Sequence, residues 1–222
     1  MEFLAGQLRP IYPYLGELYS AAWTTLVLSL GAIVAALVLG TIVAFGRVSA
    51  HRLVRIAATF YVEFLRNIPL LVLLYFIYFL LPALGLRFSP FVSALIGMAL
   101  HESAYMTEIL RAGLSAVPVG QYEAAQSQGM TRFQLQRHIV LPQVFRTIYV
   151  PLGTQFTMVI IASSLASAIS VDEVSGWMQT AGADTFRFFD VFLIAAFVYV
   201  VLCQLVNLLH TVVGRLLFRA KG

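Results

Sequence analysis

The sequence has few charged side chains, one lysine and one cysteine. Charged residues make up 11% of the 222 positions and hydrophobic residues 60%, whereas about 25% of a typical soluble domain is charged. This deficit excludes an ordinary soluble domain and indicates a membrane protein. Because a membrane-spanning helix needs about 20 mostly apolar residues, the chain has room for about five of them.

The scarce residues also exclude several kinds of site. The only lysine is Lys221, so the chain lacks the Gly-x-x-x-x-Gly-Lys-Ser/Thr loop in which a lysine contacts the phosphates of ATP. The lone Cys203 permits neither an internal disulfide nor a cysteine metal cluster. The sequence also lacks the Gly-x-Ser-x-Gly nucleophile motif. We therefore expect no catalytic residue, metal site or cofactor in this chain.

The apolar residues gather in five long runs, which predict an all-α integral membrane protein with a single domain over residues 1–222. The runs are continuous, whereas the strands of a membrane β-barrel alternate between apolar and polar residues. In the first run, Ala32, Ala36 and Gly40 recur every fourth residue and should let another helix approach closely. The predicted spans cover about 19–46, 53–81, 90–110, 150–169 and 189–217.

The basic residues predict how these spans are oriented. With five spans, most basic residues lie on one side of the membrane. Because basic residues are retained in the cytoplasm, the amino terminus is predicted outside, and the carboxy terminus and residues 118–142 inside. This placement favours contact with membrane lipid over a nucleic-acid partner. The inner residues are Arg47, Arg52, Arg55, Arg111, Arg132, Arg137, Arg146, Arg215, Arg219 and Lys221, and the outer ones are Arg9, Arg87 and Arg187.

The polar segment 118–142 predicts two short helices at an angle. Good helix formers occupy 121–128, and Gly129 suits the left-handed position that ends a helix. Thr131 and Gln134 have the spacing of a capping box, which begins a new helix. That helix should end near Val140, because Pro142 disfavours helical geometry in the preceding residue.

The same segment resembles the EAA loop of permease subunits of bacterial ABC importers. Three further segments, 61–72, 104–113 and 163–165, resemble the polar amino acid branch of these permeases, with the patterns Tyr-x-Glu-x-x-Arg-x-x-Pro-Leu-Leu-Val, Ala-Tyr-x-x-Glu-Ile-x-Arg-x-Gly and Ser-Ser-Leu. The resemblance extends over about residues 16–215. The loop positions that match, and that the resemblance assigns to ATPase coupling, are Glu123, Ala124, Ala125, Gly129, Ile139, Leu141 and Pro142.

The resemblance implies a type I ABC importer permease fold in the bacterial inner membrane. The partners it implies are a second permease subunit, identical or homologous, ATPase subunits that dock on residues 121–140, and an external substrate-binding protein. ATP and magnesium would be bound by the ATPase, and a polar amino acid would be carried. One departure concerns Ile161 and Ala162, where the family usually has lysine followed by aspartate or asparagine. The polar pair would then come from a partner subunit, or the substrate differs.

Several polar residues in the spans are candidates for particular roles. Glu63 and Arg66 are three residues apart and should share a helix face, which predicts a scaffold ion pair, with substrate contact as the alternative. Asp172 and Glu173 follow the fourth span and are expected to be solvated outside the membrane, with contact to the binding protein as the alternative. Candidates for lining a substrate pathway, with hydrogen bonding between helices as the alternative, are Tyr105, Glu108, Gln155, Ser163 and Ser164.

Two other functional classes fit the sequence less well. His101-Glu102 begins like the zinc motif His-Glu-x-x-His, but Tyr105 stands where the second histidine is needed, which argues against an intramembrane metalloprotease. An ion-coupled secondary transporter could use Glu63 or Glu108, but the chain shows no recognisable inverted repeats. Dependence of uptake on ATP discriminates these alternatives from an ABC permease.

Overall fold

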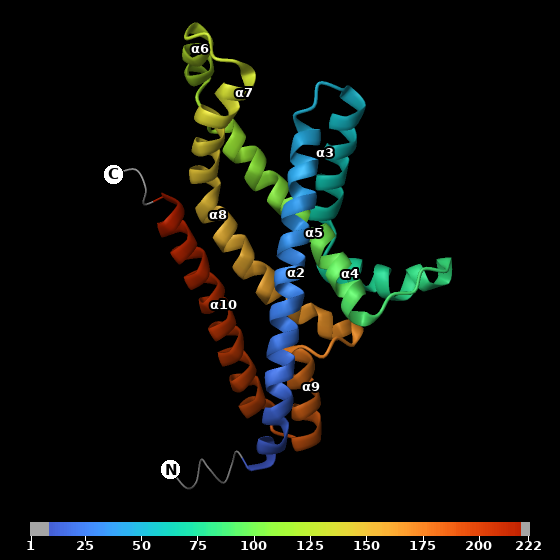
Figure 1. Cartoon of the computed structure of the whole chain (residues 1–222). Helices are drawn as coiled ribbons and strands as arrows, with labels where there is room; N and C mark the ends of the chain where they lie inside the picture. Colours follow the sequence, from blue (N-terminus) through green and yellow to red (C-terminus); the bar gives the residue numbers. More distant parts are fainter. Residues whose placement is uncertain (1–8, 219–222) are drawn as a thin grey trace.

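A computed structural model describes residues 9–218, in which every regular element is helical. Figure 1 shows α6 and α7 at one end of the molecule, and α9 with the start of α2 at the other. The predicted coupling segment and the segment before the last long helix therefore lie at opposite ends. The elements are η1 (Arg9–Tyr14), α2 (Leu15–Arg47), α3 (Arg52–Asn67), α4 (Leu70–Tyr75), η2 (Phe76–Leu80), η3 (Leu81–Leu84), α5 (Pro90–Ser115), α6 (Val119–Ser127), α7 (Arg132–Leu135), η4 (Gln136–Val140), α8 (Leu141–Ala162), η5 (Ser163–Ile169), α9 (Val174–Thr185) and α10 (Phe188–Phe218).

The centre of the fold is the packing of α2 against α5. Ala32, Ala36 and Gly40 of α2 are all buried, as their spacing predicts. A Cβ placed on Gly40 would lie 2.8 Å from the Met106 Cβ and 2.9 Å from the Ser103 carbonyl oxygen. Glycine at this position therefore lets the two helices approach more closely than any other residue would.

The predicted second span, 53–81, is not one straight helix. Its two halves, Arg52–Asn67 and Leu70–Leu84, are bent by 104° at the break between them. Ile68 is extended at φ −98° and ψ 130°, and Pro69 precedes the first residue of α4. The residue before a proline is pushed out of helical geometry, so the proline that interrupts this run causes the bend.

Three helical segments in the described residues are long and apolar enough to cross a membrane: Pro10–Arg47, Arg132–Ile169 and Phe188–Phe218. The bent pair provides a fourth if it counts as one span. The predicted third span corresponds to α5, which begins at Pro90 as expected and continues to Ser115 but does not meet this test. Its buried face carries Glu102, Ser103 and Thr107, which lower its hydropathy. The number of five membrane spans therefore stays a prediction.

The segment between the last two predicted spans contains a helix that the sequence pattern did not predict. This is α9, which packs against α2 and α10 through Val174, Trp177 and Ala181. The Trp177 Nε1 donates a hydrogen bond of 2.8 Å to the Tyr14 carbonyl oxygen. This stretch mixes small, polar and apolar residues, so its sequence pattern does not indicate a helix.

Candidate functional site

The candidate coupling loop is built around a tight turn at Gly129. The φ of Gly129 is +72°, as its predicted left-handed role requires. Its N–H donates to the Gln126 carbonyl oxygen at 2.9 Å, and the Met130 N–H donates to the Ala125 carbonyl oxygen at 3.1 Å. These two bonds form a Schellman motif that ends α6. The predicted break between two helices at Gly129 is confirmed.

The second of these helices starts as predicted but does not stop as predicted. Thr131 and Gln134 form the full capping box at the start of α7. The expected end near Val140 is wrong, because the chain passes through the π-helical turn η4 directly into α8. Pro142 occupies the first turn of α8, where its missing N–H costs little, and the wider π turn accommodates its ring. Span four therefore joins the coupling loop without a break.

The EAA residues of α6 divide between an outer and an inner side. Glu123 and Ala124 are exposed, whereas Ala125 is 3% exposed and packs in a cluster with Leu135 and Val140. The same cluster includes Val144 and Ile148 of α8, and Ile139 packs at its edge. Leu141 and Pro142 are exposed. Ala125 thus packs α6 into a cluster that it shares with α7, η4 and α8, while Glu123 and Ala124 remain available to a partner.

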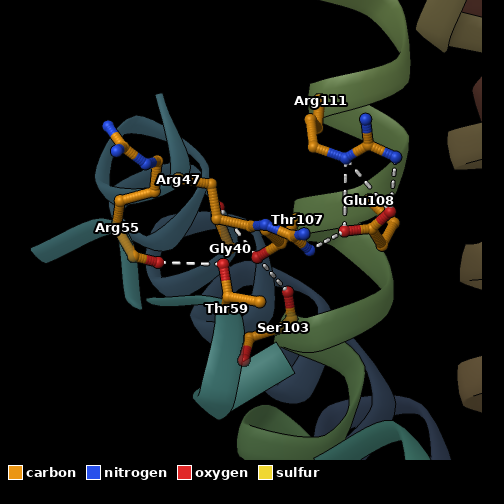
Figure 2. A network of polar contacts seen from close by, with 8 residues as sticks. All are labelled: Gly40, Arg47, Arg55, Thr59, Ser103, Thr107, Glu108 and Arg111. Atoms are coloured by element: carbon orange, nitrogen blue, oxygen red, sulfur yellow. Dashed lines mark hydrogen bonds and ion pairs between the residues drawn. The ribbon is translucent and has the colours of Figure 1, made fainter. Parts of the chain in front are cut away.

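Glu108 joins α5 to α2 instead of standing free along a pathway. Figure 2 shows Arg47 and Arg111 converging on its carboxylate. Arg47 Nη1 pairs with Oε1, and Arg111 Nη2 donates to Oε2 at 2.8 Å. Next to this pair, the Thr107 hydroxyl donates to the Gly40 carbonyl oxygen at 3.1 Å. These contacts favour the interhelical alternative for Glu108.

Gln155 and Tyr105 also have partners within the bundle. Gln155 Nε2 donates to the Glu102 Oε2 at 2.6 Å, which links α8 to α5. Glu102 is 3% exposed, and its other oxygen lies 3.2 Å from Nδ1 of His101. The Tyr105 ring lies beneath the Arg66 guanidinium, 5.4 Å from ring centroid to Cζ. His101, Glu102 and Gln155 therefore form a hydrogen-bonded group within the bundle.

The two serines at the end of α8 bond to their own helix. Ser163 is buried and donates to the Ile160 carbonyl oxygen at 2.7 Å. Ser164 is half-buried and donates to the Ile161 carbonyl oxygen at 2.7 Å. In the described structure neither hydroxyl reaches another helix. Hydroxyls held by a carbonyl three residues back stabilise the tight 3₁₀ turn η5 in which these serines lie.

The predicted ion pair between Glu63 and Arg66 is not formed among the described residues. Both side chains are exposed, and Arg66 lies over the ring of Tyr105 instead. An exposed pair three residues apart on a helix gains only about 0.2–0.5 kcal/mol. The contact between Arg66 and the aromatic ring on α5 replaces it.

Glu173 is a buried polar centre that the sequence interpretation missed. We expected it to be solvated, yet it is fully buried. Its Oε1 accepts from the backbone N–H groups of Ser175 at 2.8 Å and Gly176 at 3.0 Å, so it caps α9. Its Oε2 accepts from the hydroxyls of Tyr199 on α10 and Thr25 on α2. Glu173 therefore joins three helices at the end opposite the loop.

Burial raises the pKa of the Glu173 carboxyl, and the hydrogen bonds from Tyr199, Ser175, Gly176 and Thr25 oppose that shift. A carboxylate taken out of water loses hydration, which favours its protonated form. The sequence signal for this site was weak. Glutamate is not among the preferred capping residues, and only the fold brings Thr25 and Tyr199 to it.

Comparison with known proteins decides the family. The family model described as "Binding-protein-dependent transport system inner membrane component" matches residues 36–219. The chain belongs to this family. Among curated relatives, the probable amino-acid ABC transporter permease protein YckA of Bacillus subtilis is 35% identical, with 86% of this chain and 84% of the relative covered. The L-cystine transport system permease protein TcyB of the same organism is 37% identical, with 88% and 84% covered.

Solved structures agree with the type I importer fold. An amino acid ABC transporter crystallised with histidines matches with a TM-score of 0.86 and 30% identity, covering 92% of this chain and 96% of that one. The MetNI methionine ABC transporter shares the fold, with a TM-score of 0.73 and 18% identity, covering 91% and 97%. The family resemblance found in the sequence is confirmed. The chain is a membrane-embedded permease subunit of an ABC importer.

Proposed function

We propose that this permease carries a polar amino acid that an external binding protein delivers. The support is the agreement of relatives whose names refer to amino-acid, glutamine and cystine transport. A polar substrate needs a path that shields it from lipid, which a pair of permease subunits, identical or homologous, would enclose. We place the chain in the bacterial inner membrane as one domain with five spans, the amino terminus outside and the carboxy terminus in the cytoplasm.

The single observation that carries the mechanism is the division of α6 into an exposed and a buried side. Glu123 and Ala124 are exposed on a helix whose Ala125 packs in the cluster shared with α7, η4 and α8. Small side chains let a helix sit deeply in a groove of a partner. We therefore place the ATPase on residues 121–140, with ATP and magnesium bound by the ATPase. Movement of α6 would pass to α8 directly, because η4 makes the connection helical.

Movement would also reach α5 and α2. The cluster around Ala125 includes Ile109 and Leu110 of α5 at its edge, and Glu108 ties α5 to Arg47 of α2. ATP binding would bring the two ATPases together and move both loops inward. The spans that follow would tilt and open the path toward the binding protein.

The residues that line the substrate path are a separate part of the proposal. Tyr105 of α5 and Gln155 of α8 stay candidates because both are half-buried, and Gln155 is also hydrogen-bonded to Glu102. Ser163, Ser164 and Glu108 are already bonded within the chain. Ile161 is 50% exposed, so the position that is usually polar in the family presents an apolar side chain. A partner subunit could supply the polar pair.

Charge reversal on α6 tests the coupling proposal. The complex is purified with its ATPase, once with Glu123→Lys and once with Asp172→Lys as a matched control. Asp172 is also an exposed acid, but it lies on the opposite end of the fold, beside α9. We expect Glu123→Lys to lose bound ATPase and ATP-driven uptake, and Asp172→Lys to keep its ATPase. If Glu123→Lys retained both, the coupling proposal would be wrong.

A panel of labelled acidic, amide and basic amino acids in proteoliposomes tests the substrate class. We expect uptake of at least one of them to require ATP and the binding protein together. Uptake of none of them by an otherwise active complex would contradict a polar amino acid substrate and leave the coupling proposal standing.

A further inference from the structure

A groove of about 750 Å³ lies between α2, α8 and α10, on the half of the molecule that contains the coupling loop. Leu30 and Ile33 of α2 form one wall. Phe145 and Phe156 of α8 and Leu209 and Val213 of α10 form the others. The groove is independent of the residues used above for coupling, except for Pro142 at its rim.

The floor of the groove is fixed by close packing of α8 on α10. The rings of Tyr149 and His210 stack with centroids 4.0 Å apart, and the Tyr149 hydroxyl donates to the His210 carbonyl oxygen. Gly153 and Gly214 leave room for these rings, because a Cβ on either would lie within 2.6 Å of a ring atom. The close packing of α8 on α10 therefore determines the shape of the groove.

Large apolar side chains of the groove are left exposed by the chain itself. Phe145 is 56% exposed, Leu209 61% and Leu30 45%. In a membrane, such surface is covered by lipid chains or by another helix. A narrow groove between three helices favours a flexible occupant that follows its shape, which is the property of an acyl chain.

One end of the groove is basic. Arg146 lines it next to Phe145 and Pro142, and Arg215 lines the adjoining hollow on the other side of Tyr149 and His210. Arg219 and Lys221 follow Phe218 in the sequence and lie outside the described residues. Basic pockets between membrane helices on the cytoplasmic side are suited to anionic lipid headgroups.

We propose that this groove binds a phospholipid with an anionic headgroup, its acyl chain against Phe145, Leu209 and Leu30 and its phosphate on Arg146. The proposal rests on the orientation given under Proposed function, which puts Arg146 at the cytoplasmic surface. Arginine suits this role, because its stem packs on apolar surface while its guanidinium binds phosphate. The lipid would join α8, the helix that continues from the coupling loop, to α2 and α10.

Native mass spectrometry of the permease tests this proposal. The complex is taken from nanodiscs of equal phosphatidylglycerol and phosphatidylcholine, and the lipid that stays bound is identified. We expect phosphatidylglycerol to be retained in preference. Arg146→Gln should lower that preference by about fivefold, since a basic residue near the surface contributes about 1 kcal/mol to binding anionic lipid. Leu209→Trp should reduce retention of both lipids by filling the groove.

Two matched variants serve as controls. Arg52→Gln removes the same charge from an exposed position at the start of α3 that does not line the groove, and Leu208→Trp adds the same ring to the exposed side of α10 beside it. Both should retain lipid like the unmodified chain. Equal retention of the two lipids by the unmodified chain, or unchanged retention in Arg146→Gln and Leu209→Trp, would overturn the proposal.

A crosslinking experiment tests the alternative occupant, which is a second copy of the chain. If Leu209→Cys on two copies of the chain formed a disulfide in membranes, the groove would be a contact between subunits, and the lipid proposal would fail. This result leaves the transport proposal intact, because loss of ATPase binding in Glu123→Lys is measured separately from lipid retention.

Discussion

Arg47 at the end of α2 is ion-paired with Glu108 on α5, and Arg111 on α5 holds the other oxygen of the same carboxylate. The side chains of Arg47 and Glu108 are 17% and 21% exposed. The pair lies where α5 leads into the segment before α6. It therefore connects the helix that enters the coupling loop with the helix at the centre of the fold.

Removing the Glu108 charge should destabilise the permease. In Glu108→Gln the two arginines would lose their counter-charge in a half-buried place. A hydrogen bond to a charged group contributes about 1.5–3 kcal/mol, and we expect a loss at the lower end because the site is partly exposed. Thermal unfolding in detergent measures the effect. Glu63→Gln is the control, since Glu63 is exposed and its carboxylate has no ion pair among the described residues. Equal midpoints for the two variants would contradict this role.

A larger residue at Gly40 should separate α2 from α5. The Cβ of Gly40→Val would lie 2.8 Å from the Met106 Cβ and meet the Ser103 backbone. Overpacking of this kind costs about 1–3 kcal/mol. Expression and thermal stability of Gly40→Val should fall. Gly16→Val in the same helix should change neither by comparable amounts, because nothing lies within 4 Å of a Cβ there.

The turn between α6 and α7 should tolerate asparagine at Gly129 better than valine. The φ of +72° costs an ordinary residue about 1–2 kcal/mol, and asparagine adopts it more easily than most. We expect Gly129→Val to weaken ATPase association and Gly129→Asn to preserve most of it. Binding of the ATPase is measured by co-purification with equal amounts of permease. Equal association for valine and asparagine would show that the turn geometry does not position α6.

Glu173 should make stability depend on pH. It lies between the last two predicted spans, and burial raises its pKa above an unfolded value of about 4.3. A raised acid pKa means that the stabilisation is fully present below the unfolded value and is lost as pH rises through the folded one. Glu173→Gln can cap α9 but does not titrate. Its unfolding temperature relative to that of the unmodified chain should therefore increase as the pH rises above the unfolded value of about 4.3.

Two variants complete the Glu173 test. Glu173→Ala would leave the N–H groups of Ser175 and Gly176 without their cap. Each buried group left unpaired costs about 1–3 kcal/mol, so this variant should unfold at a lower temperature at every pH. Asp172→Asn, at an exposed neighbour, should show no comparable change with pH. If the unfolding temperatures of Glu173→Gln and the unmodified chain differed by the same amount at every pH, burial would not raise the pKa of this carboxyl.

Local signals predicted the coupling loop well. Gly129 and the Thr131–Gln134 capping box act within a few residues, so their geometry follows from their own sequence. The helix end that Pro142 predicted near Val140 is wrong. Proline is unfavourable inside a helix but acceptable in its first turn after a π bulge. Whether the chain takes that route depends on the packing of Val140 and Val144 against α6, which no local pattern contains.

The bonding partners of the polar residues depend on tertiary contacts. Glu108 pairs with Arg47, which is 61 positions away, and Glu173 bonds to Thr25, which is 148 positions away. The sequence marks such residues as costly inside a membrane protein but does not name their partners. The bend of span two had a local cause in Pro69, while its angle of 104° depends on how α4 packs against α5.

ATP-driven uptake by reconstituted complex tests the central claim most directly. Proteoliposomes hold the permease with its ATPase, the loaded binding protein is added outside, and an ionophore removes every ion gradient. We predict that labelled amino acid accumulates only with ATP inside, that the ionophore does not reduce it, and that Glu123→Lys abolishes it. Uptake that proceeds without ATP and disappears with the ionophore would contradict an ATP-driven permease and favour an ion-coupled transporter.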